Sequence, residues 1–307
     1  MGEMPTTRTS ADPTTTPPTR DPGVRSARLS LARRRFLRLG ALSVVGAPVV
    51  AAGYALGIEP ARLSLERVRL PIAGLAPALQ GLRIVQLSDV HLHPGQAPRL
   101  ARRAVALANR LAPDLIVLTG DYTSDSADPL DRLAAELEAL RSPLGAFACL
   151  GNHDVWYDAG RARRSLEDVG IRVLVNQGVI VRVGDAALYL AGLDDGWSGA
   201  PDLAAALVGC PPGAAVLLLA HEPDLAPRWA AEGRVTLQLA GHSHGGQVRL
   251  PGIGAPLLPY LGERYDLGLY RVGEMWLYVS RGVGTTGPPL RLGCPPEVTE
   301  ITLVRPS

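Results

Sequence analysis

The chain has 307 residues, of which 47% are hydrophobic, and this allows one large domain or two small ones around a sizeable core. It contains no lysine, so all 31 basic residues are arginine, and mechanisms that need a lysine, such as a P-loop or a Schiff base, are excluded. Residues 1–40 carry eight arginines and three acids, which leaves 23 bases and 26 acids in the remainder. That slightly acidic remainder has no electrostatic footprint for nucleic acid.

The first 58 residues differ in composition from the rest. Residues 1–30 are rich in Thr, Pro and Arg, cannot bury enough apolar surface to fold, and are predicted to be a disordered tail. Residues 31–58 contain Arg33-Arg34-Arg35-Phe36-Leu37 followed by an uncharged run over 39–57, which is the layout of an export signal. The paired arginines resemble the twin-arginine signal, which predicts export by that machinery to the outer face of the membrane, the cell wall or the periplasm. An uncleaved membrane anchor is the alternative, because the uncharged run over 39–57 is close to the length of about 20 apolar residues that a membrane span needs.

Strands and helices alternate from Leu63 onward, which predicts a layered α/β fold. The expected strands of the first half are 82–88, 115–119 and 146–150, and the expected helices are 99–111, 130–140 and 160–169. The second half is rich in strands: 179–183 and 187–191 flank Gly184-Asp185, 267–272 and 275–280 flank Gly273-Glu274, and 216–220, 235–240 and 298–304 stand alone, with a helix over 224–231. No internal linker interrupts this pattern, so residues 63–307 are predicted to form one domain.

All six histidines lie in four short segments, each of which follows an apolar run that is typical of a buried strand. Imidazole and carboxylate side chains that converge from several strand ends suit divalent transition metals. The segments are Asp89-Val90-His91-Leu92-His93, Gly151-Asn152-His153-Asp154, His221-Glu222 and Gly241-His242-Ser243-His244, and Gly120-Asp121 ends a further strand.

Spacing suggests how these side chains share a site. Asp89 and His91 are two residues apart on a segment expected to be extended, so both can reach one ion. An asparagine carbonyl is a reasonable neutral ligand, so Asn152 is a candidate, and its neighbour His153 would point elsewhere and handle protons. The alternative is that each histidine only bonds to the backbone at the end of its strand. Because five strand ends carry such residues, chance placement of this kind is a poor explanation.

The order of these blocks resembles the calcineurin-like metallophosphoesterase superfamily over about residues 82–304. The segments 241–248, 221–224 and 294–297 resemble a bacterial branch of exported or membrane-associated phosphodiesterases. The resemblance implies a four-layer α/β/β/α sandwich of two mixed β-sheets flanked by helices, with the metal site at strand ends. It also implies a dinuclear phosphoesterase that hydrolyses a phosphodiester or a pyrophosphate with a hydroxide held between two divalent ions, Mn, Fe or Zn.

Roles carry over from the family motifs residue by residue. The resemblance assigns Asp89, His91 and His244 to the first ion, Asn152, His221 and His242 to the second, and Asp121 to both. It makes His153 the proton donor or transition-state stabiliser, with Asp154 holding its ring. Some relatives in this branch cleave the pyrophosphate of a UDP-linked lipid sugar, so a lipid-linked or nucleotide-sugar substrate is a hypothesis here.

Alternatives stay open at this point. A broad-specificity phosphomonoesterase and a non-catalytic metal-binding scaffold share the same motifs. A serine hydrolase is disfavoured because Gly241-His242-Ser243-His244-Gly245 is not followed by a helical pattern. The apolar segment 251–261 either borders the site, as a contact for an acyl chain or a membrane, or packs into the core.

Three further features of the sequence lie outside this set of ligands. His93 either contacts substrate or faces solvent. Asp194-Asp195 is interpreted first as a loop cap and second as a residue near the substrate. The three cysteines are interpreted as free structural thiols.

Overall fold

The computed structural model describes residues 1, 48–93 and 97–306. Apart from Met1, the predicted tail over 1–30 lies outside the described residues, as does the predicted signal or anchor up to residue 47. Residues 51–307 form one compact unit, in which 51–57 are helical and lead into a short 3-10 turn, η1 (Glu59–Ala61). Within 48–93 and 97–306, no helix combines the length and the apolar character needed to cross a membrane.

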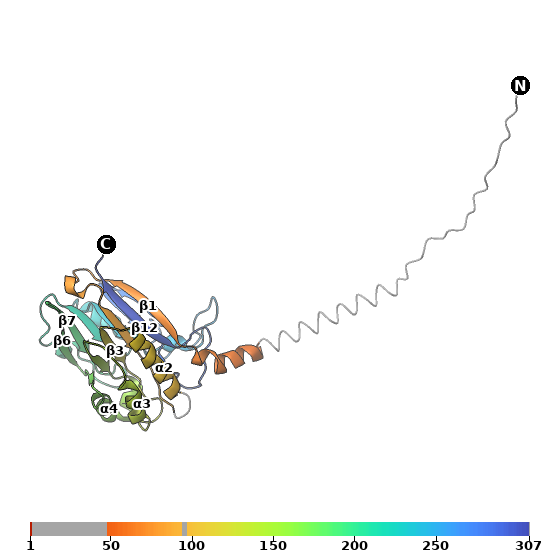
Figure 1. The fold of residues 1–307 in the computed structure, drawn as a ribbon, viewed down its shortest axis with the longest axis horizontal. Helices are drawn as coiled ribbons and strands as arrows, with labels where there is room; N and C mark the ends of the chain where they lie inside the picture. Colours follow the sequence, from red (N-terminus) through yellow and green to blue (C-terminus); the bar gives the residue numbers. More distant parts are fainter. Residues whose placement is uncertain (2–47, 94–96, 307) are drawn as a thin grey trace. The chain divides into compact units, whose positions relative to one another are not determined.

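The first sheet has six strands and joins the two ends of this unit. Its spatial order is β1 (Ser64–Pro71), β12 (Glu297–Val304), β2 (Arg83–Leu87), β3 (Leu115–Thr119), β4 (Ala146–Cys149) and β5 (Ile171–Val173). The sheet is mixed, because β12 runs parallel to β1 and antiparallel to β2, while β2 to β5 are parallel. Figure 1 shows β1 and β12, from opposite ends of the unit, side by side.

The second sheet also has six strands and is also mixed. Its order is β10 (Gly268–Val272), β11 (Met275–Val279), β9 (Leu237–Ala240), β8 (Ala215–Leu219), β7 (Ala186–Gly192) and β6 (Gln177–Val183). The two predicted hairpins are confirmed, since β6 pairs antiparallel with β7 and β10 with β11. Gly184 and Gly273 adopt φ of 59° and 56° in the turns, the left-handed conformation that tight hairpins require.

Three apolar layers hold the sheets and helices together. In β3, Leu115 and Val117 face the core between the two sheets, whereas Ile116 and Leu118 face the core under the helices. The helices α2 (Ala97–Arg110), α3 (Leu130–Leu137) and α4 (Asn152–Glu167) cover the first sheet, and α5 (Leu203–Ala206) and α6 (Ala226–Ala231) pack on the second. This arrangement confirms the predicted four-layer sandwich.

The main departure from the predicted elements is α4, which begins at Asn152 and not near residue 160. The backbone leaves helical geometry at Asp158, so the apolar spacing is not continuous across the element and only its second part is visible in the sequence. At its start, the Asp154 carboxylate accepts the Gly151 backbone N–H at 2.9 Å and caps the first turn. The Asn152-His153 pair is therefore presented by a helix N-terminus.

Candidate metal centre

Five parallel strands from the two sheets direct their carboxyl ends to the predicted ligands. In open α/β sheets this edge is where ligands bind, because the loops that leave the strands meet there. Asp89 and His91 follow β2, Asp121 follows β3, Asn152 and His153 follow β4, His221 follows β8, and His242 and His244 follow β9. Distant parts of the sequence thus supply one cluster.

The cluster contains three groups of donor atoms. Within each group, the ligand atoms lie within 4.8 Å of one another. Asp121 is central, since its Oδ2 lies 3.3 Å from His91 Nε2 and 3.1 Å from His221 Nε2. On one side, His244 Nε2 lies 3.4 Å from Asp89 Oδ1 and 2.9 Å from His91 Nε2. The groups are Asp89, His91 and His244; His91, Asp121 and His153; and Asp121, His221 and His242.

The backbone at the cluster is strained and not extended. Asp89 and His91 have φ of 49° and 43°, so the prediction that they share a side because the segment is extended was wrong, although both reach the cluster. Asp121, His242 and His244 also adopt positive φ, of 57°, 70° and 51°. Such conformations cost about 1–3 kcal/mol each and persist where surrounding contacts enforce them. Here Asp89 Oδ1 accepts the His242 backbone N–H at 2.9 Å, and His91 N donates to Asp121 O at 3.0 Å.

The donor atoms fit divalent cations. Among the described residues, Asn152 Oδ1 and Asp89 Oδ2 are buried and have no hydrogen-bond partner, and the buried His221 Nε2 faces the Asp121 carboxylate. His221 Nδ1 lies 2.6 Å from Thr119 O and His242 Nε2 lies 2.7 Å from Tyr260 O, so each ring turns its other nitrogen inward. Outer hydrogen bonds of this kind fix the tautomer and orientation of metal-binding histidines.

Burial and mutual charge set the protonation of the cluster. Burial lowers the pKa of His242 to about 4, and burial together with His91 holds the pKa of His244 well below its usual value, so both rings are neutral at pH 7, as metal ligands must be. Burial opposes ionisation of Asp121, yet His221 and His91 hold the pKa of this carboxyl well below its ordinary range. Burial raises the pKa of Asp89. A cation would stabilise the ionised form of this second carboxylate.

Asp154 and His153 are neighbours in sequence but act on different partners. The Asp154 carboxylate accepts the backbone N–H groups of Asp121 at 2.8 Å and Tyr122 at 2.9 Å in addition to that of Gly151. It does not hold the His153 ring, because successive residues of a helix point about 100° apart. The ring is instead fixed by Ser124 O, 2.5 Å from His153 Nδ1. This corrects the expected role of Asp154, which shapes the loop that carries Asp121.

Ser243 and the cysteines have structural contacts. Ser243 Oγ donates to Asp266 O at 2.5 Å, and Ser243 caps a short 3-10 turn, η4 (His244–Gly246), which does not continue as an α-helix. The surroundings of this serine therefore do not match a nucleophile elbow. Cys149, Cys210 and Cys294 are all free, as predicted, and Cys294 Sγ donates to His244 O at 3.2 Å.

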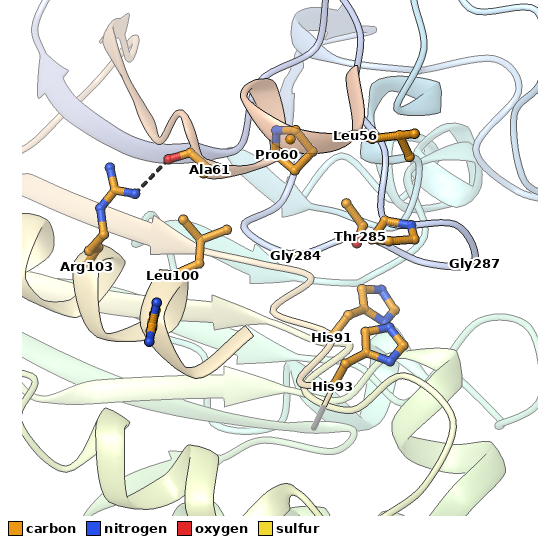
Figure 2. Close-up of a pocket in the computed structure, with 13 residues that line it drawn as sticks. Leu56, Pro60, Ala61, His91, His93, Leu100, Arg103, Gly284, Thr285 and Gly287 are labelled. Atoms are coloured by element: carbon orange, nitrogen blue, oxygen red, sulfur yellow. Dashed lines mark hydrogen bonds between the residues drawn. The ribbon is translucent and has the colours of Figure 1, made fainter. Parts of the chain in front are cut away.

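A cavity of about 710 Å³ opens beside the cluster, with His91 and His93 in its wall (Figure 2). Leu56, Pro60 and Leu100 supply apolar walls. His93 thus lies at the cavity but outside the three donor groups, with Nδ1 3.7 Å from Asp125 Oδ2. The cavity also contains two arginines, Arg99 and Arg103, the latter bonded to Ala61 O at 2.6 Å.

Two residues that support the cluster had no signal in the sequence. Arg291 is fully buried, and its guanidinium donates to the carbonyls of Arg281, Gly282, Gly284 and Cys294. It thereby holds the segment 281–284 against Asp89, whose carbonyl accepts Gly284 N at 2.6 Å. Trp197 lies over His242, with ring centroids 5.9 Å apart. A lone arginine or tryptophan far from the histidines is found only through the fold.

Comparison with known proteins agrees with this geometry. A model of the calcineurin-like phosphoesterase family matches residues 82–246, more than half of the chain. The chain belongs to this family. This calcineurin-like phosphoesterase is a metal-dependent phosphoester hydrolase.

Relatives of this phosphoesterase match most of its length. It is 33% identical over 282 residues to the uncharacterized metallophosphoesterase YkuE of Bacillus subtilis, covering 89% of this chain and 98% of that protein. It is 34% identical over 284 residues to the phosphodiesterase YaeI of Escherichia coli, covering 89% of this chain and all of that protein. A bovine transmembrane protein with a metallophosphoesterase domain is 35% identical over 253 residues, which are 77% of this chain and 56% of that protein.

Proposed function

We propose that this phosphoesterase is a dinuclear phosphodiesterase or pyrophosphatase. Asp89, His91 and His244 would hold one ion, and Asn152, His221 and His242 the other. The observation that carries the proposal is the position of Asp121, whose Oδ2 lies close to a nitrogen of each set. Bound cations of this kind polarise phosphoryl oxygens and lower the pKa of a water ligand, which is the chemistry they would supply.

His153 is suited to donate a proton to the leaving group. Its Nδ1 faces a carbonyl oxygen, so Nδ1 carries a hydrogen and the second proton of the imidazolium sits on Nε2. Burial lowers the pKa of His153, so its imidazolium is a stronger acid than that of a free histidine, and a bound anionic phosphate would favour this protonated form. The ring also lies 4.8 Å from the His91 ring, centroid to centroid, and is therefore within the cluster that would bind the phosphate.

We infer that the substrate is a lipid-linked phosphate ester or a nucleotide sugar, with an apolar arm in the cavity beside His91. The segment 251–261 supports an amphiphilic substrate. It borders the cluster through Tyr260 O, and it exposes Ile253 and Leu257 by 74% and 81%. Apolar side chains exposed so fully at the rim of a site mark an interaction surface.

Replacing Leu257 and Leu258 by serine tests this surface. The double variant should lose activity on a phosphate ester with a long acyl chain and keep activity on a water-soluble diester. Equal loss on both would show that the segment supports folding and not substrate contact.

We further propose that residues 63–307 are the catalytic domain and that the twin-arginine machinery exports it to the outer face of the membrane, the cell wall or the periplasm. The arginine pair Arg33-Arg34 and the uncharged run over 39–57 support this proposal. Replacing both arginines by lysine should retain the protein in the cytoplasm, as followed by cell fractionation. Unchanged export would contradict it.

Metal analysis of the purified protein, combined with a substrate panel, tests the function. We expect about two equivalents of Mn, Fe or Zn and hydrolysis of diesters or nucleotide-sugar pyrophosphates in preference to monoesters. Asp121→Asn should reduce metal content and activity, whereas Asp131→Asn, an exposed carboxylate on α3, should change neither. Preference for monoesters would identify a phosphomonoesterase, and absence of turnover with every divalent metal a binding scaffold.

A further inference from the structure

Three aromatic side chains, Trp156, Trp197 and Tyr260, form an aromatic rim beside the metal centre. Trp197 contacts both others edge to face, with centroid separations of 4.9 Å to Trp156 and 5.3 Å to Tyr260. The rim continues into the cluster, because Trp156 lies 5.0 Å from the His153 ring and Trp197 lies 5.9 Å from the His242 ring. All three remain exposed, by 45%, 40% and 58%. Exposed contiguous aromatic surface of this kind is typical of a binding site.

The loop that carries Trp197 is fixed by carboxylates. Glu222, the neighbour of His221, accepts the Gly196 N–H at 2.8 Å, and Asp195 accepts the Ser198 N–H at 2.6 Å. Asp194 accepts the Ala200 N–H at 2.9 Å. This explains the Asp194-Asp195 pair as loop caps. Three carboxylates therefore hold a short loop on either side of one tryptophan.

Close packing fixes the loop further. A Cβ on Gly196 would lie 2.5 Å from Leu225 Cδ1 and 2.7 Å from Glu222 Oε2, so the glycine lets the loop pack directly against these two side chains. Trp156 Nε1 donates to Ser198 Oγ at 2.7 Å, which ties the first ring of the rim to the loop of the second. A half-exposed ring held this firmly is preorganised for contact with something outside the protein.

The chemistry of the rim limits what it can bind. Among the described residues, guanidinium groups stack on Trp229, Tyr265 and Trp276 and on none of the rim residues. The free faces are therefore uncharged π surfaces. Such surfaces bind flat rings in preference to saturated chains, because stacking adds to the burial of apolar area.

We propose that the aromatic rim binds a flat, uncharged ring in the leaving group of the phosphate ester. This rests on the proposed function, in which His153 gives its proton to that leaving group and stands against Trp156. The ring is either an aryl group or a nucleobase, which share this chemistry. Trp197 and Trp156 are accordingly specificity-determining residues for the group that departs.

The test uses the metal-loaded full chain and two diesters with leaving alcohols of equal acidity, ethyl 3-phenylpropyl phosphate and ethyl 3-cyclohexylpropyl phosphate. Wild type should prefer the phenyl diester in kcat/KM for release of the larger alcohol. Trp197→Ala should lower that value about 5- to 20-fold for the phenyl diester and at most about 3-fold for the cyclohexyl diester. Trp197→Phe should keep most of the preference. Trp276→Phe, on β11 outside the rim, is the matched control.

A second readout does not depend on turnover. Titration with 3-phenylpropylphosphonate should quench tryptophan fluorescence in wild type and in Trp276→Phe, with little change in Trp197→Ala, whereas the cyclohexyl phosphonate should bind more weakly. A parallel experiment uses a thymidine diester in place of the phenyl compound, so that binding of a nucleobase is compared with binding of an aryl group.

The outcomes separate the two proposals. Equal kcat/KM for both diesters, with equal loss in Trp197→Ala, would overturn the rim as a ring site and leave the phosphodiesterase intact. If no diester is hydrolysed, the proposed function fails, and the fluorescence titration still decides whether the ring binds. A different result would be that Trp197→Ala no longer sediments with anionic vesicles and that its kcat/KM is equal for the two diesters. The rim would then contact a membrane, and the proposal would be wrong.

Discussion

Replacing Arg291 by methionine should destabilise the protein by about 3–5 kcal/mol. The buried guanidinium donates to four backbone carbonyls, those of Arg281, Gly282, Gly284 and Cys294. A buried acceptor that loses its donor costs about 1–3 kcal/mol. The summed cost for the four carbonyls is partly offset, because the variant no longer buries a charge and some of the carbonyls can accept hydrogen bonds from water. The net destabilisation is therefore about 3–5 kcal/mol, the cost of breaking a buried charged network.

Urea unfolding followed by circular dichroism measures this change. Arg291→Lys should lose about half as much, since one ammonium cannot reach four divergent carbonyls. Arg102→Met, which removes an exposed arginine paired with Glu136, should lose less than about 1 kcal/mol. Metal content should fall in Arg291→Met, because Arg291 Nη2 also lies 3.5 Å from His244 Nδ1. A loss below about 1 kcal/mol in Arg291→Met would refute the reasoning.

Three other predictions concern the metal centre and the surface. Gly120→Ala should lower metal content and activity, since its Cβ would lie 2.7 Å from His221 Nδ1. Gly74 also has a positive φ but faces open space, so Gly74→Ala should affect stability only. Equal metal content in the two variants would contradict this prediction. Chelation with EDTA should lower the Tm and added Mn²⁺ should restore it, because a ligand at 100 times its Kd stabilises by about 2.7 kcal/mol; an unchanged Tm would count against a resident metal. Hydrogen bonding from Arg161 lowers the pKa of Asp131 below 3.8. The ionised carboxylate therefore stabilises the folded protein above that pH, and this contribution is lost as the pH falls through the folded pKa. The Tm difference between wild type and Asp131→Asn should therefore shrink below pH 3.8, and a constant difference would exclude the ion pair as its cause.

The order of elements and the place of the cluster could be predicted because they depend on local patterns. Apolar runs mark β2, β3, β4, β8 and β9, and each is followed within three residues by histidine, aspartate or asparagine. The carboxyl ends of neighbouring parallel strands share an edge of a sheet, so convergence follows from topology alone. The strand β1 was missed, because its burial depends on β12 and its own sequence mixes charged and apolar residues.

The conformation of the site could not be predicted in the same way. The positive φ of Asp89 and His91 arises from contacts with segments far along the chain, such as Asp121 and His242. The partners of Asp154 and the position of Trp197 depend likewise on which loops become neighbours. Tertiary contacts of this kind leave no periodic trace in the sequence, so isolated residues such as Trp197 carry no signal of their role.

The pairing of β1 with β12 has a consequence for how the molecule is made. Ser64 lies opposite Glu297, and β12 also separates β1 from β2, so the first sheet cannot form completely until the last strand has left the ribosome. Contacts between such distant parts of a chain form late and slowly. The nascent protein must therefore keep its apolar segments from aggregating until β12 has emerged. Completion of the first sheet is thus a late step of folding, and a metal ion that needs the finished cluster cannot bind before it.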